Sequence, residues 1–121
     1  MAIPIARVIL YVKDIPTVAR FYQTHFGMTP LTSTEDGWQE LMGEAGSCQI
    51  ALHRASARQT SGTAVKIVFG IADVRQFVEE RAAAGLKFGR IHEPGTFMFA
   101  NAKDPAGNSI QISSRGLMVC R

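Results

Sequence analysis

The feature that most constrains this chain is an internal repeat. Asp14 and Asp73 each stand directly before an apolar stretch with helical spacing, where a carboxylate caps a first turn, and Gly27 and Gly85 each end that stretch. Each predicted helix follows an apolar, β-branched segment and precedes short segments with strand patterning. The pattern predicts two strand–helix–strand–strand–strand (βαβββ) units in tandem. The predicted units cover approximately residues 5–53 and 64–113.

Local patterns predict the strands of each unit. In the first unit they are residues 5–12, 28–32, 38–42 and 48–53. In the second unit they are residues 64–71, 86–91, 97–100 and 109–113. The segment Asp104-Pro105-Ala106-Gly107-Asn108 has turn composition, so we interpret it as the turn that starts the last strand rather than as a catalytic motif. Because neither unit is large enough to be stable alone, we predict one α+β domain over residues 1–121.

Composition restricts the class of protein. Of the 121 residues, 46% are hydrophobic and 19% are charged, which is globular rather than disordered composition. The net charge of +3 comes from scattered Lys and Arg, so no nucleic-acid partner is expected. No apolar run approaches the ~20 residues of a membrane span. Cys48 and Cys120 have no metal-binding spacing; a disulfide between them stays open, but idle thiols in the cytoplasm are the favoured interpretation.

Strand alternation separates a packing face from a mixed face in four strands. The apolar set in the first strand is Val8, Leu10 and Val12, which leaves Arg7, Ile9 and Tyr11 on the other face. By the same alternation, the remaining three strands put the following residues on the mixed face: Gln49, Ala51, His53, Lys66, Val68, Gly70, Ser109, Gln111 and Ser113. A concave face of half-polar character is what a small-molecule site requires.

Two segments carry a resemblance to a known family. Residues 7–28, RVILYVKDIPTVARFYQTHFGM, resemble the opening strand, helix and "FY…LGM" close of the vicinal oxygen chelate superfamily, which includes glyoxalases, bleomycin-resistance proteins and ring-cleaving dioxygenases. Residues 99–113, FANAKDPAGNSIQIS, resemble its closing "DPdGn.iel" turn and strand. The resemblance implies curved sheets that enclose a ligand cavity, and a homodimer.

The resemblance also implies a metal site, which this sequence does not match. Metalloenzymes of the family take one ligand from each of four strands, and the matching positions here are Arg7, Ala51, Lys66 and Gln111. Only Gln111 has a lone pair to donate, because Arg and protonated Lys are cations. A transition-metal site needs about three or four N, O or S donors. We therefore expect no metal and no other cofactor.

The candidate ligand-binding residues are Arg7, Tyr11, Trp38, Gln49, His53, Lys66 and Gln111. Arg7 and Lys66 could hold an anionic ligand, but Arg7 could instead pair with Glu40 while Lys66 extends into solvent. Aromatic side chains (Tyr11, Trp38, Phe97, Phe99) could form a wall for a planar ligand or simply pack in the core. His53 or Tyr11 could be an acid–base group, although an exposed strand-end histidine is the commoner case.

These residues predict a small-molecule-binding protein without a metal, with a cavity for an anionic or polar ligand. The alternative is an enzyme, lyase-like or dioxygenase-like, that acts on a small metabolite. A third possibility is a subunit whose dimer surface is its whole function. No catalytic residue is assigned.

Overall fold

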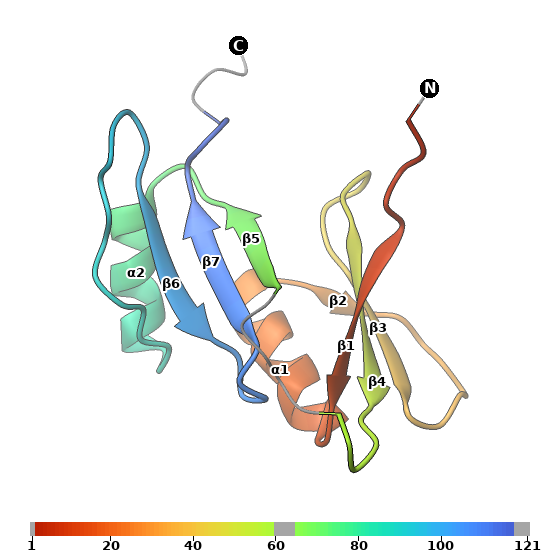
Figure 1. Cartoon of the computed structure of the whole chain (residues 1–121). Helices are drawn as coiled ribbons and strands as arrows, with labels where there is room; N and C mark the ends of the chain where they lie inside the picture. The colour runs from red at the N-terminus through yellow and green to blue at the C-terminus, as the bar shows by residue number, and fades with distance from the viewer. Residues whose placement is uncertain (1, 60–64, 118–121) are drawn as a thin grey trace. The chain divides into compact units, whose positions relative to one another are not determined.

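The computed structural model describes residues 2–59 and 65–117, and it has an α+β fold (Figure 1). The described residues form two helices and two β-sheets. The chain divides into two compact units, Met1–Ser61 and Gly62–Arg121, and each contains one helix and one sheet. The boundary falls in the segment between the two predicted repeats.

The first unit has a mixed four-stranded sheet and one helix. Its elements are β1 (Arg7–Val12), α1 (Ile15–Phe26), β2 (Thr29–Pro30), β3 (Trp38–Met42) and β4 (Gln49–Arg54). The strand order is β1-β4-β3-β2, with β1 parallel to β4 and the other neighbours antiparallel. A parallel pair needs a crossover connection, and α1 forms the helical part of it.

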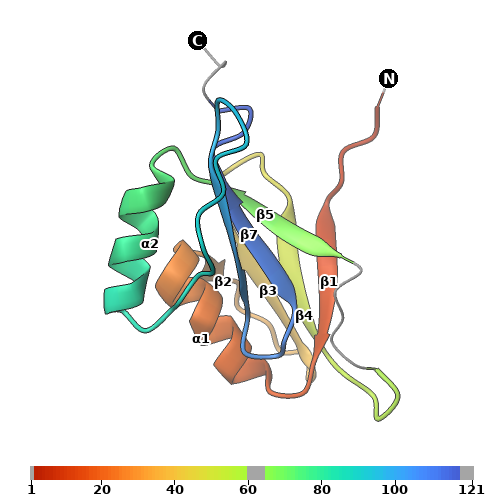
Figure 2. The same cartoon turned by 60° about the vertical axis from the view of Figure 1, so that its left-hand side comes forward.

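The second unit repeats this pairing scheme with fewer strands. Its elements are β5 (Lys66–Gly70), α2 (Val74–Ala83), β6 (Phe99–Lys103) and β7 (Ser109–Ser113). The order is β5-β7-β6, with β5 parallel to β7 and β6 antiparallel to β7; β5 and β7 run alongside each other in Figure 2. In both units, therefore, the strand before the helix pairs with the last strand of the unit.

The helix boundaries confirm the predicted caps. The carboxylate of Asp14 accepts hydrogen bonds from Thr17 N at 3.2 Å and from Thr17 Oγ1 at 2.7 Å. The carboxylate of Asp73 accepts one from Gln76 N at 3.0 Å. Gly27 has φ +65°, a left-handed conformation that favours glycine after a helix. Both aspartates act as helix caps, as the sequence predicts.

The predicted strand at residues 86–91 is absent. This segment lies beside β6, where Gly89 N donates to Asn101 O at 2.8 Å and His92 N donates to Phe99 O at 2.9 Å. Three steps separate the two donors but only two steps separate the acceptors, so the segment carries one extra residue. An extra residue bulges a strand and interrupts its ladder of hydrogen bonds. The second unit is therefore not the complete βαβββ unit predicted for it.

All but two of the other predicted strands have different bounds, and the differences at β2 and β6 have structural consequences. The strand predicted at residues 28–32 is limited to the two residues of β2, the second of which is Pro30 and has no N–H to donate. The strand predicted at residues 97–100 is β6 instead, which starts and ends later. This shift affects the candidate site, because it adds Asn101 and Lys103 to the sheet.

The core of the first unit lies between α1 and its sheet. Helix α1 contacts β2, β3 and β4, and its Val18 and Tyr22 are buried. The buried apolar residues on this side of the sheet are Leu10, Val12, Leu41, Ile50 and Leu52, and Ala51 is buried on the other side. In the second unit the buried apolar residues are Val74, Leu86, Ala100, Ile110 and Ile112. Leu10, Val12, Ile50, Leu52, Ile110 and Ile112 belong to the predicted packing sets and are buried. In β1 they alternate with exposed residues, as predicted, whereas β7 also buries Ser109 and Ser113 of the predicted mixed face.

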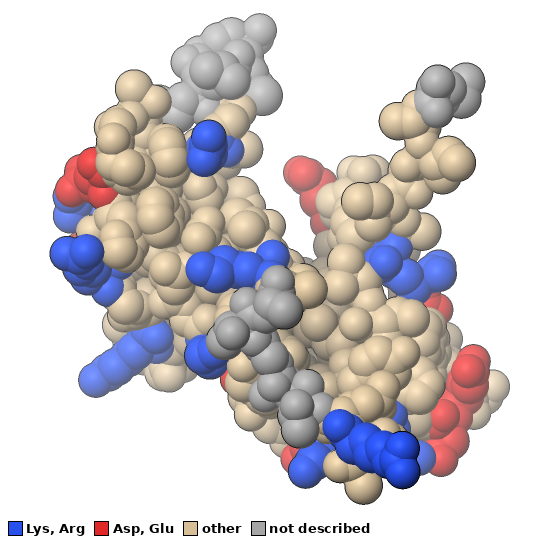
Figure 3. All heavy atoms as spheres, in the orientation of Figure 1, with Lys and Arg blue, Asp and Glu red and all other residues tan. Residues whose placement is uncertain are grey.

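Surface features agree with the composition. Lys and Arg side chains occupy separate patches on the face visible in Figure 3, rather than one continuous stripe. Within residues 2–59 and 65–117, no helix is long and apolar enough to cross a membrane. Cys48 is a free, exposed thiol, whereas Cys120 lies outside the described residues, so the open question of a disulfide is not tested.

Candidate functional site

The face of the first sheet that bears Arg7, Ile9 and Tyr11 collects most of the candidate residues. Residues paired directly across neighbouring strands project to the same side of a sheet. The register pairs Arg7 with Gln49, Tyr11 with His53, and His53 in turn with Trp38. The first face, as we name it, consists of Arg7, Ile9, Tyr11, Trp38, Glu40, Gln49, Ala51 and His53. Five of the seven predicted ligand-binding residues thus lie on one surface.

Arg7 is part of an ion pair on this face. Its Nε lies 3.6 Å from Glu40 Oε1, and the indole Nε1 of Trp38 donates to Glu40 Oε2 at 3.3 Å. The Arg7 side chain is 46% exposed and that of Glu40 is 30% exposed. An exposed pair of this kind contributes about 0–1 kcal/mol to stability. Its larger consequence is electrostatic, because Glu40 offsets the charge that Arg7 would otherwise present to an anion.

Three aromatic side chains lie beside the ion pair. The ring centroids of Tyr11 and His53 are 5.2 Å apart, and those of Trp38 and His53 are 6.1 Å apart in an edge-to-face arrangement. His53 Nδ1 is 2.9 Å from Arg54 O. A carbonyl oxygen only accepts, so Nδ1 must carry the proton and the lone pair of a neutral ring is on Nε2.

We call Tyr11, Trp38 and His53 the aromatic group; two of its members, Tyr11 and His53, border an open depression of about 600 Å³ at the end of β1 and β4. The other lining residues come from the turn before β3 and the segment that follows His53. They are Asp36, Gly37, Arg54, Ala55, Ser56 and Gln59. A volume of this size lies within the usual range for small-molecule sites.

Gln49 differs from the other predicted residues of this face. Its Oε1 accepts a hydrogen bond from Gly43 N at 3.1 Å, and its Nε2 donates to Ser47 O at 3.0 Å. Both ends of the amide are therefore engaged with the loop between β3 and β4. Gln49 supports the shape of this hairpin.

The corresponding surface of the second unit carries a polar network. The second face, as we name it, consists of Lys66, Val68, Gly70, Phe99, Asn101, Lys103, Ser109, Gln111 and Ser113. Lys66 Nζ donates to Asn101 Oδ1 at 3.0 Å, and Gln111 Nε2 donates to the same oxygen at 2.9 Å. The structure thus joins two predicted residues, Lys66 and Gln111, through a third that the sequence analysis missed.

Asn101, Lys103 and Ser109 were missed as site residues for an identifiable reason. The strand predicted at residues 97–100 stops before Asn101 and Lys103, so these residues had no place on the sheet. The available signal was the alternation of small Ala100 and Ala102 with the larger residues between and beside them. Ser109 belongs to the predicted mixed face, but no charged residue stands next to it in the sequence, so the sequence alone indicates no binding role for it.

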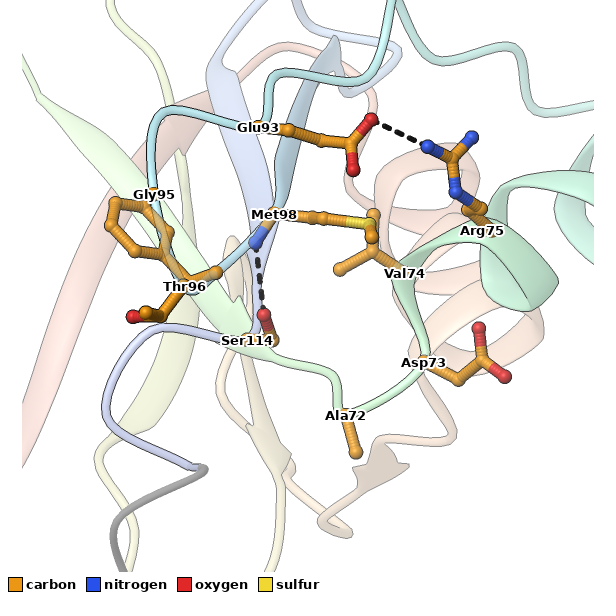
Figure 4. Close-up of a pocket in the computed structure, with 10 residues that line it drawn as sticks. Ala72, Asp73, Val74, Arg75, Glu93, Gly95, Thr96, Met98 and Ser114 are labelled. Carbon is orange, nitrogen blue, oxygen red and sulfur yellow. Dashed lines mark hydrogen bonds and ion pairs between the residues drawn. The ribbon is translucent and has the colours of Figure 1, made fainter.

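A separate cavity of about 370 Å³ lies at the start of α2 (Figure 4). Arg75 and Glu93 form an ion pair across its rim, and Met98 extends toward Val74 inside it. Ser114 Oγ accepts a hydrogen bond from Met98 N at 3.0 Å. The remaining lining residues are Ala72, Asp73, Gly95, Thr96 and Phe97. Its charged groups are paired with each other or cap the helix, so it offers little to hold a polar ligand.

Comparison with known proteins identifies the family. The model of the Glyoxalase/Bleomycin resistance protein/Dioxygenase superfamily matches residues 4–112, so the chain belongs to this superfamily. No curated protein matches the sequence.

Solved structures with the same fold include proteins of different roles. A lactoylglutathione lyase from Agrobacterium tumefaciens is 20% identical with a TM-score of 0.74, and the match covers 96% of each chain. A virulence protein from Salmonella typhimurium is 26% identical with a TM-score of 0.70, over 93% of this chain and 97% of that one. An antibiotic binding protein from a Streptomyces species is 17% identical with a TM-score of 0.76, over 93% of this chain and 96% of that one.

The residues at the family's metal positions do not fit a divalent ion. Arg7 is a cation paired with Glu40, Ala51 has no side-chain donor, and Lys66 is a cation that donates to Asn101. Gln111 alone retains an oxygen that could bind a metal. Among the described residues, no group of three His, Cys, Asp or Glu side chains is close enough to hold an ion.

Proposed function

We propose that this protein binds a small molecule, without a metal, on the first face. The observation that carries the proposal is the aromatic group of the first face. Tyr11 is 41% exposed and Ile9 is 40% exposed, although both lie in a strand whose alternate residues are buried. Uncovered aromatic and apolar side chains beside a few placed polar groups are typical of a binding site for an organic ligand.

The proposed ligand has a planar aromatic part and a polar or anionic part. Tyr11, Trp38 and His53 supply ring surfaces for stacking, and Glu40, Arg7 and His53 Nε2 supply hydrogen-bonding groups beside them. The ion pair makes this face nearly neutral, so it favours the planar part of the ligand. The antibiotic binding protein from Streptomyces supports the proposal only in that the same fold is used there for binding.

Fluorescence of Trp38 tests the proposal directly, because Trp38 is the single tryptophan of the chain. Titration with a panel of planar aromatic compounds, each in anionic, neutral and cationic forms, should give saturable changes in emission. The Tyr11→Leu variant should weaken binding by about fivefold, which corresponds to about 1 kcal/mol for a lost aromatic contact.

The matched control is Phe88→Leu, which removes an aromatic ring that packs against Phe77 outside both faces. It should leave the affinity unchanged. Equal losses in the two variants, or a preference for cationic ligands over the anionic and neutral forms, would contradict the proposal.

A second candidate is an enzyme that acts on a small metabolite. The hydrogen bond between His53 Nδ1 and Arg54 O favours it, because it leaves Nε2 as a proton acceptor beside Tyr11. Turnover of a metabolite that survives chelator and is lost in His53→Gln would support this function. Turnover that needs an added divalent ion would contradict the proposed metal independence.

We also propose that the protein is a homodimer. Large apolar side chains are exposed on both faces, including Ile9, Tyr11 and Val68. Exposed apolar area and unpaired strand edges favour association with a second chain. Sedimentation should give a dimer at micromolar concentration, and a monomer at that concentration would refute this part of the proposal.

A further inference from the structure

We propose that Lys66, Ser109 and Lys103 form a binding site for a phosphoryl or phosphonate group. The inference deepens the proposed function, on which it rests, by naming the class of anion that the second face binds. The second face is the better candidate for an anion than the first, because Glu40 already offsets the charge of Arg7.

The three residues form a row across three adjacent strands. The register pairs Lys66 of β5 with Ser109 of β7, and Ser109 with Lys103 of β6. Paired residues project to the same side, so the two lysines flank the serine on the second face. With a strand spacing of about 4.8 Å, the two lysine backbones lie about 10 Å apart, and their flexible side chains can meet above Ser109. A cavity of about 320 Å³ is lined by all three residues together with Asn101, Ala102 and Ile110.

Ser109 supplies the observation that points to a ligand. It is only 8% exposed, yet its hydroxyl has no hydrogen-bond partner among residues 2–59 and 65–117. The oxygen is not among the fully inaccessible side-chain atoms that lack a partner, so it opens onto the cavity, where a ligand could take the place of solvent. The hydroxyl lines the cavity and can donate to an acceptor placed there.

The charged side chains that line the cavity are both lysines. Neither Lys66 nor Lys103 has an ion-pair partner in the described part of the chain. The neighbouring carboxylate, Asp104, is buried and accepts hydrogen bonds from Ala106 N and Asn108 N. Two ammonium groups that approach each other repel unless an anion lies between them.

The donor set selects the kind of anion. Two ammonium groups and one hydroxyl supply hydrogen-bond donors from three strands. The ammonium group of Lys66 also donates to Asn101 Oδ1 at 3.0 Å, and this bond holds the side chain in position. A phosphoryl group has three strongly accepting oxygens and a charge near −2, which matches three donors and two positive charges. A carboxylate has two oxygens and a single charge, so it would leave one donor unused.

Calorimetric titration with phenyl phosphate, inorganic phosphate and benzoate tests this site on the full chain. Phenyl phosphate should bind at least about tenfold more tightly than benzoate, since loss of a charge-assisted hydrogen bond weakens binding by about that factor. Binding of inorganic phosphate would show that the site recognises the free ion. If phenyl phosphate binds and inorganic phosphate does not, the phosphoryl group is recognised as part of a larger ligand; either result supports the site.

The variants locate the site. Lys103→Gln should weaken binding of phenyl phosphate by about tenfold and Ser109→Ala by about fivefold, whereas Lys87→Gln, which removes an exposed charge elsewhere in the same unit, should change it less than twofold. Circular dichroism checks that each variant is folded, and Lys66→Gln provides a second charge variant.

Equal losses in Lys87→Gln and Lys103→Gln, equal affinity for benzoate and phenyl phosphate, or no saturable binding of phenyl phosphate would overturn the inference. Failure of this inference is distinguishable from failure of the proposed function, because the Trp38 titration measures ligand binding to the first face, which belongs to the other unit. Saturable emission changes with planar compounds that carry no phosphoryl group would leave the proposed function standing without this site.

Discussion

Asp104 is predicted to be among the most important polar residues for stability. It is 4% exposed, and its Oδ1 accepts hydrogen bonds from Ala106 N and Asn108 N, each at 2.9 Å. Its Oδ2 accepts another from Asn108 Nδ2 at 3.1 Å. These bonds close the turn between β6 and β7. Asp104→Ala removes all three at once and leaves two backbone donors without their acceptor.

The expected cost follows from the strength of such bonds. A hydrogen bond to a charged group contributes about 1.5–3 kcal/mol, and two of the three share one oxygen, so we expect a total loss of about 3 kcal/mol. With a urea dependence of about 1.5 kcal/mol per molar, the midpoint of unfolding should fall by about 2 M. Asp104→Asn keeps one accepting oxygen and should lose about half as much.

Urea unfolding followed by circular dichroism measures the change, with Asp73→Ala as a comparison because it removes a single bond at the exposed cap of α2. Loss of one cap costs about 1 kcal/mol. If Asp104→Ala is no more destabilising than Asp73→Ala, the turn does not depend on this carboxylate and the argument from its hydrogen bonds is wrong.

Three further predictions concern the core, the response to pH and the first face. Leu52→Ala, at a fully buried position, should lower the free energy of unfolding by about 3 kcal/mol in urea denaturation. Ile9→Ala, at a 40% exposed position, should lower it by less than about 1 kcal/mol. Similar losses in the two variants would contradict the assignment of these residues to opposite faces of the sheet. The hydrogen bonds from Arg54 lower the pKa of Asp36 below its usual value, so this pair stabilises the fold above pH ~4 and the contribution disappears as the pH falls through the lowered pKa. Unfolding midpoints of Asp36→Asn should therefore depend less on pH in the acid range than those of the wild type, and parallel profiles would refute this. Glu40→Gln removes the counter-charge of Arg7 but keeps an acceptor for Trp38, so aromatic carboxylates should bind about threefold more tightly in the Trp38 fluorescence assay; an unchanged affinity would mean that Arg7 does not reach the ligand.

Much of the fold could be predicted because its signals are local. Asp14 and Asp73 cap the helices through hydrogen bonds to residues three positions away, and Gly27 ends α1 with a left-handed backbone. Alternation within a strand fixes which residues share a face, so Arg7 and Tyr11 could be placed together without coordinates. The strand at residues 86–91 could not be excluded in this way, because its bulge depends on the register with β6.

The candidate site was only partly predictable, because the charge and hydrogen-bonding capacity that each residue presents depend on the side chains next to it in the fold. The sequence by itself determined the two repeated units, their caps and the mixed character of the exposed faces, since each follows from residues close together in the chain. Only the tertiary structure decided that Glu40 offsets Arg7, that Asn101 joins Lys66 to Gln111, and that Ser109 lies between two lysines. Each of these contacts joins residues on different strands. Strand order and register bring such residues together, and both are set by packing and hydrogen bonding between segments distant in the sequence.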